Sequence, residues 1–112
     1  MADDCLFCKI VAGDVPSDRV YEDDVAIAFR DINPQAPTHV LVIPREHIVD
    51  LRELAQRPDV AGPYIKAIAD VADALEASDF RTVFNTGAKV GQSVFHIHAH
   101  VLAGRPMGWP PG

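Results

Sequence analysis

The sequence lacks any long hydrophobic run, any cluster of basic residues, and any repeat or low-complexity tract. Its apolar stretches fall far short of the roughly 18 consecutive residues that span a membrane. The first four residues, MADD, are acidic, whereas a secretory signal peptide begins with a basic segment. We therefore expect a cytoplasmic protein that neither crosses nor binds a membrane.

Basic residues are also scarce overall. Ten Lys and Arg stand against 16 Asp and Glu, which gives a formal net charge of −6. Nonspecific binding to nucleic acid or to an anionic membrane depends on clustered Lys and Arg, so we expect neither partner. If the ligand is an anion, backbone amides, hydroxyls or histidines must meet its charge locally.

The chain is short, and its composition is that of an ordinary globular protein. It has 112 residues, of which 48% are hydrophobic and 23% are charged, and its mean hydropathy is +0.05. This length predicts one domain over residues 1–112 and excludes barrels and two-domain dinucleotide enzymes. Residues 105–112, which end in WPPG, are expected to form a tail without helix or strand.

Hydrophobic periodicity and turn residues predict the order of the elements. We expect a short helix over 4–13, a hairpin of strands 20–22 and 25–30, a loop over 31–38, a strand over 39–43, a long helix over 62–77, a strand over 80–85, a glycine-bearing loop over 86–93, and a strand over 94–102. In the long helix, Ile65, Ile68, Ala69, Ala72, Leu75 and Glu76 recur at helical spacing. Because helix and strand do not alternate regularly, the pattern indicates an α+β fold with the long helix on one face of an antiparallel sheet.

Three of the five histidines lie within five residues, in the run VFHIHAHVL. Side chains alternate along a strand, so His96, His98 and His100 are predicted on one face, with Phe95, Ile97, Ala99 and Val101 on the other. A single metal ion cannot use all three histidines, because the outer two are about 13 Å apart along a strand. The pattern favours a face that carries chemistry over three solvated imidazoles.

The two cysteines, Cys5 and Cys8, form a C-x-x-C pair. In a cytosolic chain such a pair is seldom a structural disulfide, which leaves metal binding or redox chemistry. The surrounding sequence lacks the βαβ pattern of a thioredoxin-like protein, so a redox role is disfavoured.

The run His96-Ile-His98-Ala-His100-Val-Leu resembles the motif of the histidine triad (HIT) superfamily of nucleotide hydrolases and transferases. Four further segments are similar, in order and spacing, to the Hint branch of that superfamily and to its zinc-carrying bacterial type: FRDINPQAPTH over 29–39, VIPREH over 42–47, GQS over 91–93, and WPPG over 109–112. The resemblance implies a HIT-like fold with a five-stranded antiparallel sheet, one long helix and a short N-terminal helix. It also implies a homodimer in which a ten-stranded sheet runs across both chains.

The resemblance implies an adenosine phosphoramidase-like enzyme that hydrolyses nucleoside 5′-phosphoramidates of purine nucleotides and releases a nucleoside monophosphate. His98 would attack the α-phosphorus and form a nucleotidyl-histidine, His100 would assist the leaving group, and His39 would lie near the site and relay protons. The catalytic set implied is His96, His98, His100 and Ser93. The phosphate would be held by Asn85 and by the amides and hydroxyl of Gly91, Gln92 and Ser93.

The nucleoside would lie in a pocket formed by residues from the first third of the chain. Asp31 would accept hydrogen bonds from the ribose hydroxyls, and apolar side chains would surround the base: Phe7, Ile10, Phe29 and Ile32. The alternative for Phe29 and Ile32 is simple core packing, and for Asp31 it is the capping of a turn.

Cys5, Cys8, His47 and His96 make the Cys₂His₂ set that structural zinc prefers. The resemblance implies zinc on these four residues as scaffold rather than catalyst, and the alternative is an empty reduced dithiol. Two other functions stay open: hydrolysis of dinucleoside polyphosphates, and a nucleotide-binding regulatory protein in which hydrolysis is incidental.

Overall fold

The computed structural model describes residues 4–112, which form one five-stranded antiparallel sheet and three α-helices. The helices are α1 (Leu6–Ala12), α2 (Leu51–Ala55) and α3 (Pro58–Ala74). The strands are β1 (Arg19–Glu22), β2 (Ala26–Arg30), β3 (Thr38–Pro44), β4 (Phe80–Val83) and β5 (Ala99–Ala103), with a short 3-10 helix, η1, at Ala88–Val90. The expected α+β fold is confirmed.

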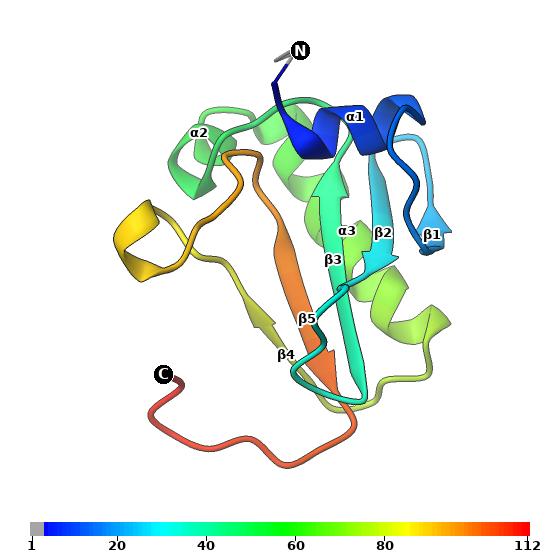
Figure 1. Ribbon diagram of the computed structural model, residues 1–112, viewed down its shortest axis with the longest axis vertical. Coiled ribbons are helices and arrows are strands. Elements are labelled where there is room, and N and C mark those ends of the chain that lie inside the picture. Colours follow the sequence, from blue (N-terminus) through cyan, green and yellow to red (C-terminus); the bar gives the residue numbers. More distant parts are fainter. Residues whose placement is uncertain (1–3) are drawn as a thin grey trace.

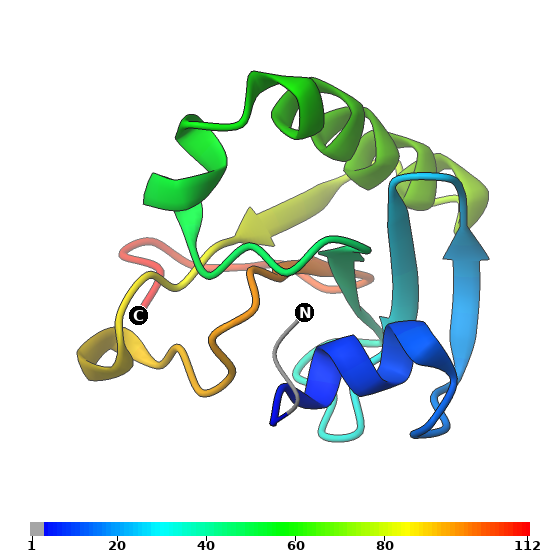
Figure 2. The same ribbon diagram turned by 90° about the horizontal axis from the view of Figure 1, so that it is seen from above.

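The strand order is β1-β2-β3-β5-β4, so β3 lies at the centre and β1 and β4 are the edge strands (Figure 1). Figure 2 shows α3 across one face of the sheet and α1 against the other. β2 and β3 are therefore buried on both faces, which explains their uninterrupted apolar sequences. None of the helices formed by residues 4–112 is long and apolar enough to cross a membrane.

The core consists of two clusters of buried residues, one on each face of the sheet, because successive side chains of a strand point to opposite faces. On the α3 side, Ala28, Val40 and Val42 pack with Val101 and helix residues. On the α1 side, Ile27, Phe29, Leu41 and Ile43 pack with α1 residues, including both cysteines. The α1 helix begins after Cys5, whose sulfur accepts the Cys8 amide, and ends at Gly13 in a left-handed conformation (φ 84°). The helix cap thus brings the two sulfurs together.

The long helix is offset from its predicted position. It begins at Pro58, four residues early, and ends at Ala74, three residues before the predicted end, where Glu76 adopts a positive φ of 58°. Its buried face consists of Val60, Tyr64, Ala67, Ile68, Val71 and Ala72. Ile65, which was expected on that face, is 52% exposed. The prediction also overlooked α2, where Asp50 caps the helix by accepting the Glu53 amide.

The predicted strand over 94–102 is only half correct, because β5 begins at Ala99. Residues 94–98 lie outside the sheet ladder, and the Ile97 amide donates to the Ile48 carbonyl at 2.6 Å instead. Ile97, Ala99 and Val101 are buried in the α3 cluster as expected, whereas Phe95 is 49% exposed. The chain leaves the ladder here because it turns toward the loop that follows β3.

We expect a matched pair of glycine substitutions to separate backbone strain from helix propensity. Gly104 has a φ of +95°, and an added Cβ would lie 2.9 Å from the Pro37 Cβ, so Gly104→Ala should destabilise the protein by about 1–3 kcal/mol. Gly62 lies in α3 with nothing near its added Cβ, so Gly62→Ala should stabilise by about 0.5–1 kcal/mol. Urea unfolding measures the free energy of unfolding of both variants. Equal changes in the two variants would contradict the strain assigned to Gly104.

Candidate functional site

His98 lies immediately before the strand β5 and is almost completely buried. Its Nδ1 is 2.9 Å from the backbone carbonyl of His96, which can only accept a hydrogen bond. The proton of the neutral ring must therefore be on Nδ1, and Nε2 carries a free lone pair. Burial lowers the pKa of His98, which keeps the ring neutral at pH 7. A neutral imidazole with a defined lone pair is a good nucleophile.

His100 has the opposite tautomer, which a chain of hydrogen bonds defines. The Gln35 amide donates to Nδ1 of His39 at 3.0 Å, so the His39 proton must be on Nε2. That proton faces Nδ1 of His100 at 2.9 Å, which leaves the His100 proton on Nε2. His98 and His100 therefore form a pair in which one ring presents a lone pair and the other a proton.

The same contacts argue against a metal ion between Asp31, His39 and His100. Their ligand atoms all lie within 4.8 Å of one another. However, the Gln35 amide occupies Nδ1 of His39, so Nε2 bears hydrogen and cannot ligate while that bond is kept. This cluster is a hydrogen-bonded relay.

Burial is the main cause of the low basicity of His100. Its pKa is lowered from 6.5 to about 4, first by desolvation and then by the neighbouring His98 and His39 rings. The pKa of His96 is lowered to about 4 by burial as well. The imidazoles of this triad are therefore neutral at pH 7.

The four predicted metal ligands meet at one point beneath α1. Nδ1 of His96 lies 3.4 Å from the Cys5 sulfur and 3.5 Å from the Cys8 sulfur, and Nδ1 of His47 lies 3.2 Å from the Cys8 sulfur. In a tetrahedral zinc site, bond lengths of about 2.3 Å to sulfur and 2.0–2.1 Å to nitrogen separate these atoms by about 3.6 Å. Both cysteines are free thiols, so the residues present fit a zinc ion.

His96 is oriented from its other side as well. Its Nε2 donates to the Pro44 carbonyl at 2.8 Å, and the ring is completely buried. Ligating histidines commonly donate their second nitrogen in this way, because the bond fixes the ring and the tautomer. The ring of His96 therefore faces the two cysteines, which distinguishes it from the rings of His98 and His100.

All five residues predicted for the nucleoside line one cavity of about 530 Å³ beside α1: Phe7, Ile10, Phe29, Asp31 and Ile32. The Phe7 and Phe29 rings meet edge to face with centroids 5.6 Å apart. Ile32 is fully exposed, so it borders the opening and core packing does not explain it. The volume lies within the range of small-molecule sites.

Sequence reasoning missed other residues of this cavity, notably Val15, Ser17 and Leu41. The hydroxyl of Ser17 is the single buried side-chain polar atom without a hydrogen-bond partner within the described part of the chain. Leu41 is buried like its neighbours along β3, and its place next to the cavity follows from the sheet register, which pairs it with Phe29. No local signal in the sequence marks these residues.

Asp31 uses its two oxygens differently. One accepts the Asn33 amide at 2.8 Å, which is the turn-capping role, and the other lies 3.4 Å from Nε2 of His39. Asp31 therefore joins the cavity beside α1 to the hydrogen-bonded chain that ends at His100.

The glycine-bearing loop brings only some of its predicted residues together. Gly91, with a φ of +107°, lies against the Asn85 side chain, and Asn85 shares a cavity with His39 and His100. The Gly91 and Gln92 amides donate within the loop, to the Ala88 and Gly87 carbonyls, and so are not free to bind phosphate in this conformation.

The side chain of Gln92 is buried and fully engaged, since it bonds the Gly87 amide and the Val49 and Val94 carbonyls. It braces the loop. Ser93 is exposed and lines a different cavity, beside Cys5 and His47. The structure thus places Asn85, but not Ser93, beside His100.

Comparison with known proteins agrees with this geometry. The model of the HIT domain family matches residues 12–107. The chain is 42% identical to the purine nucleoside phosphoramidase of Escherichia coli K12, covering 96% of this chain and 93% of that protein. It is 44% identical to a 14 kDa zinc-binding protein of Zea mays, covering 96% and 87%. The crystal structure of a HIT family hydrolase from Legionella pneumophila superimposes with a TM-score of 0.89 and 44% identity, covering 97% and 100%.

The chain therefore belongs to the HIT domain family, and it shares the fold of HIT family hydrolases. Its histidines, the cavity beside α1 and its Cys₂His₂ cluster all lie within or beside the matched segment.

The low pKa of His100 predicts how stability depends on pH. As pH falls below about 6.5, a histidine in the unfolded chain binds a proton while His100 in the folded protein stays neutral down to about pH 4. His100 should therefore lower stability as pH falls through this window. Urea unfolding between pH 7 and 4.5 should show the wild type losing about 1–2 kcal/mol more than His100→Gln. Parallel pH profiles would contradict the shift.

Proposed function

We propose that this protein hydrolyses purine nucleoside 5′-phosphoramidates to nucleoside monophosphates through a covalent intermediate on His98. The observation that carries the proposal is the His98 tautomer, because the His96 carbonyl holds the proton on Nδ1 and leaves Nε2 free to attack phosphorus. The name of the E. coli relative supports the choice of purine phosphoramidates.

The reaction proceeds in two displacements. Nε2 of His98 forms a bond to the α-phosphorus while the phosphorus–nitrogen bond breaks, and the departing amine takes the Nε2 proton of His100. His100 reacts in this step as the imidazolium, because the bound phosphate anion favours the protonated ring, so a neutral ring is left after the transfer. Water then attacks the phosphorus, the phosphorus–histidine bond breaks, and the proton of that water returns to His100. The relay from Gln35 through His39 supports this role, since it presents the His100 proton outward.

The nucleoside occupies the cavity beside α1, with the base against Phe7 and Phe29 and the ribose hydroxyls at Asp31. Phe7 also contacts the His98 ring edge to face, with centroids 5.1 Å apart, so the cavity is adjacent to the nucleophile. Asn85 donates to the phosphate from the His100 side, and Ser93 contributes its hydroxyl if the loop closes toward the nucleotide.

The direct test is AMP release from adenosine 5′-phosphoramidate by the wild type and His98→Asn. We expect the variant to lose about 10³-fold or more in turnover, because asparagine has no nucleophilic lone pair, and to retain AMP binding. Equal turnover by the two proteins would contradict the covalent mechanism. Binding without turnover in either protein would favour a nucleotide-binding regulatory protein, and dinucleoside polyphosphates would be the next substrate.

We also propose that Cys5, Cys8, His47 and His96 hold a structural zinc ion. The donor spacing described above supports this, as does the maize relative, which is named a zinc-binding protein. The ion would fix α1 against the segment that carries His98, and it takes no part in the displacement steps. A cytoplasmic location agrees with two adjacent reduced thiols.

Metal analysis of Cys8→Ala should show loss of about one zinc ion per chain, together with destabilisation of about 3 kcal/mol and some remaining turnover. Ser93→Ala, beside the same cluster but without a ligand atom for zinc, is the matched control and should keep its metal. The zinc proposal would be overturned by wild-type protein that contains no metal as purified and is as stable as the same protein loaded with zinc.

We further propose a homodimer formed through the open edge of β4. Phe80 on this strand and Ile65 on α3 are large apolar residues exposed in the single chain, and the Trp109 ring in the tail is 84% exposed. Antiparallel pairing of two β4 edges would join the sheets into ten strands.

Light scattering at micromolar concentration should give twice the mass of one chain. Phe80→Lys, which replaces an exposed apolar side chain of this edge with a charge, should shift the mass toward the monomer, whereas Arg52→Gln on α2 should not. A monomer mass for the wild type would refute the dimer.

A further inference from the structure

A second cavity, of about 250 Å³, lies beside His100 where β3, β5, β4 and the tail meet. It is lined by Gln35, His39, Arg81, Val83, Asn85, His100, Leu102, Arg105, Met107 and Pro111. Two of these residues are arginines, and none of the described residues that line this cavity is acidic. In a protein with a net charge of −6, this local excess of positive charge is unusual.

The sheet register places Arg81 on the same face as His100. Arg81 pairs with Leu102 across β4 and β5, and Val83 pairs with His100. Residues two apart on a strand share a face and lie about 7 Å from each other, so Arg81 lies one step along the sheet from His100. The opposite face of β5, with Ala99 and Val101, is covered by α3.

The guanidinium of Arg81 has no hydrogen bond or ion pair with residues 4–112, although the side chain is half buried. By contrast, the other arginine of the cavity, Arg105, donates to the Gln35 and Pro106 carbonyls. Since arginine stays charged at any physiological pH, a partly desolvated guanidinium without a partner favours binding an anion.

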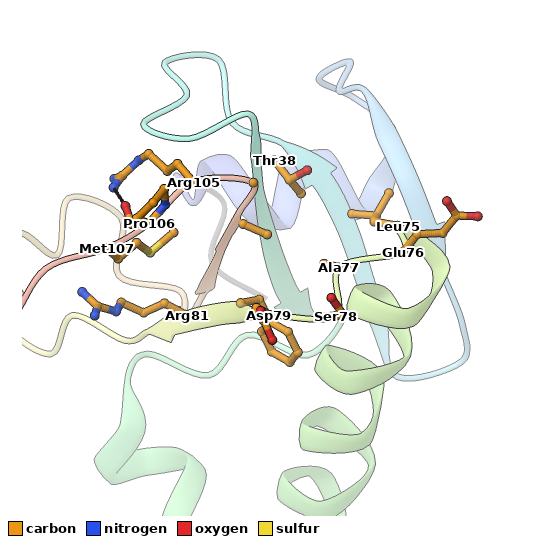
Figure 3. A pocket seen from close by; sticks show the side chains of 13 residues that line it. Thr38, Leu75, Glu76, Ala77, Ser78, Asp79, Arg81, Arg105, Pro106 and Met107 are labelled. Atoms are coloured by element: carbon orange, nitrogen blue, oxygen red, sulfur yellow. Dashed lines mark hydrogen bonds between the residues drawn. The ribbon is translucent and has the colours of Figure 1, made fainter.

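Figure 3 shows the neighbouring hollow, which shares Arg81, Arg105 and Met107 with this cavity. Arg81 from β4 and Arg105 from the tail extend to the same side, away from Leu75 at the end of α3, with Met107 between them. The two guanidinium groups thus border the same side of the site, near His100.

The position of the cavity relative to the nucleophile assigns it a role. The His98 ring lies between Phe7, which lines the nucleoside cavity, and His100, which lines this one, with centroids 5.1 Å and 5.2 Å away. In an in-line displacement the leaving group departs opposite the nucleophile, toward the group that protonates it. With the nucleoside beside α1, the leaving amine therefore extends into the cavity of Arg81.

Resting on the proposed function, we propose that this cavity is a leaving-group subsite that favours amines bearing an anionic group, with Arg81 as its specificity-determining residue. A carboxylate and a phosphate monoester share the required chemistry, since both accept paired hydrogen bonds from a guanidinium. Such an amine would keep its anionic group a few bonds from the nitrogen that His100 protonates.

The test compares adenosine 5′-phosphoramidates that differ only in the charge of the amine. One carries β-alanine, a second carries the neutral β-alanine amide, and a third carries 2-aminoethyl phosphate. For the wild-type protein we expect kcat/KM to be about tenfold higher or more for the anionic adducts than for the amide. The larger of the two anionic values identifies carboxylate or phosphate as the preferred group.

In Arg81→Gln, the ratio of anionic to neutral kcat/KM should fall toward one, and Arg81→Lys should restore part of it. Arg52→Gln, an exposed arginine on α2 remote from the cavity, is the matched control and should keep the wild-type ratio. Rising salt should reduce the wild-type ratio and leave that of Arg81→Gln unaffected.

A wild-type ratio near one, with AMP released from all three adducts, would overturn this inference and leave the proposed function intact. Failure of all three adducts and of the unsubstituted phosphoramidate would overturn both. If Arg81→Gln changes the mass in light scattering but not the ratio, Arg81 is an interface residue, and the subsite is refuted.

Discussion

His96 connects the parts of the site through its two ring nitrogens and its backbone carbonyl. Its Nδ1 faces the sulfurs of Cys5 and Cys8, its Nε2 donates to the Pro44 carbonyl, and its own carbonyl accepts the Nδ1 proton of His98. The ring thereby ties α1 to the end of β3, while the backbone of the same residue selects the tautomer of His98. A displacement of His96 would therefore disturb both the packing of α1 and the chemistry of the neighbouring histidine.

The departure of residues 94–98 from the sheet follows from the same constraint. A regular strand would pair these residues with β3 along its whole length. Instead, β5 begins at Ala99, and the Ile97 amide finds its acceptor in the loop after β3, at Ile48. His96 is thus free to reach the cysteines, while His100 stays in the ladder, where its partner across the sheet is Leu41. Ile97, Ala99 and Val101 still lie on the α3 side of the sheet, although residues 94–98 are not paired with β3.

The acidic composition is reconciled with anion chemistry by local donors. In the free protein His98 and His100 are kept neutral by burial, so they present a lone pair and a hydrogen-bond donor rather than two charges. Beside His100, positive charge comes from Arg81 and Arg105 at the border of the site. The loop at Gly91 and Gln92, whose amides bond within the loop, serves mainly to brace the segment that leads to the histidines.

The sequence by itself determined the α+β class and, apart from α2, the order of the elements, because these depend on local periodicity; it also named most of the residues that the structure brings together around the histidines. The four metal-ligand candidates meet at one point, and the five nucleoside candidates line one cavity. The ends of the helices were less predictable. The buried face of α3 also differs from the predicted face, since Tyr64 and Val71 pack into the cluster of buried residues between α3 and the sheet. Tertiary structure alone decided which nitrogen of each histidine carries the proton, which loop amides are engaged, and that Arg81 lies unpaired beside His100. Some of these contacts join distant residues, as His39 and His100 do, and others are local, as between His98 and the His96 carbonyl. All of them depend on ring and backbone orientations that the folded chain sets and that the sequence does not state.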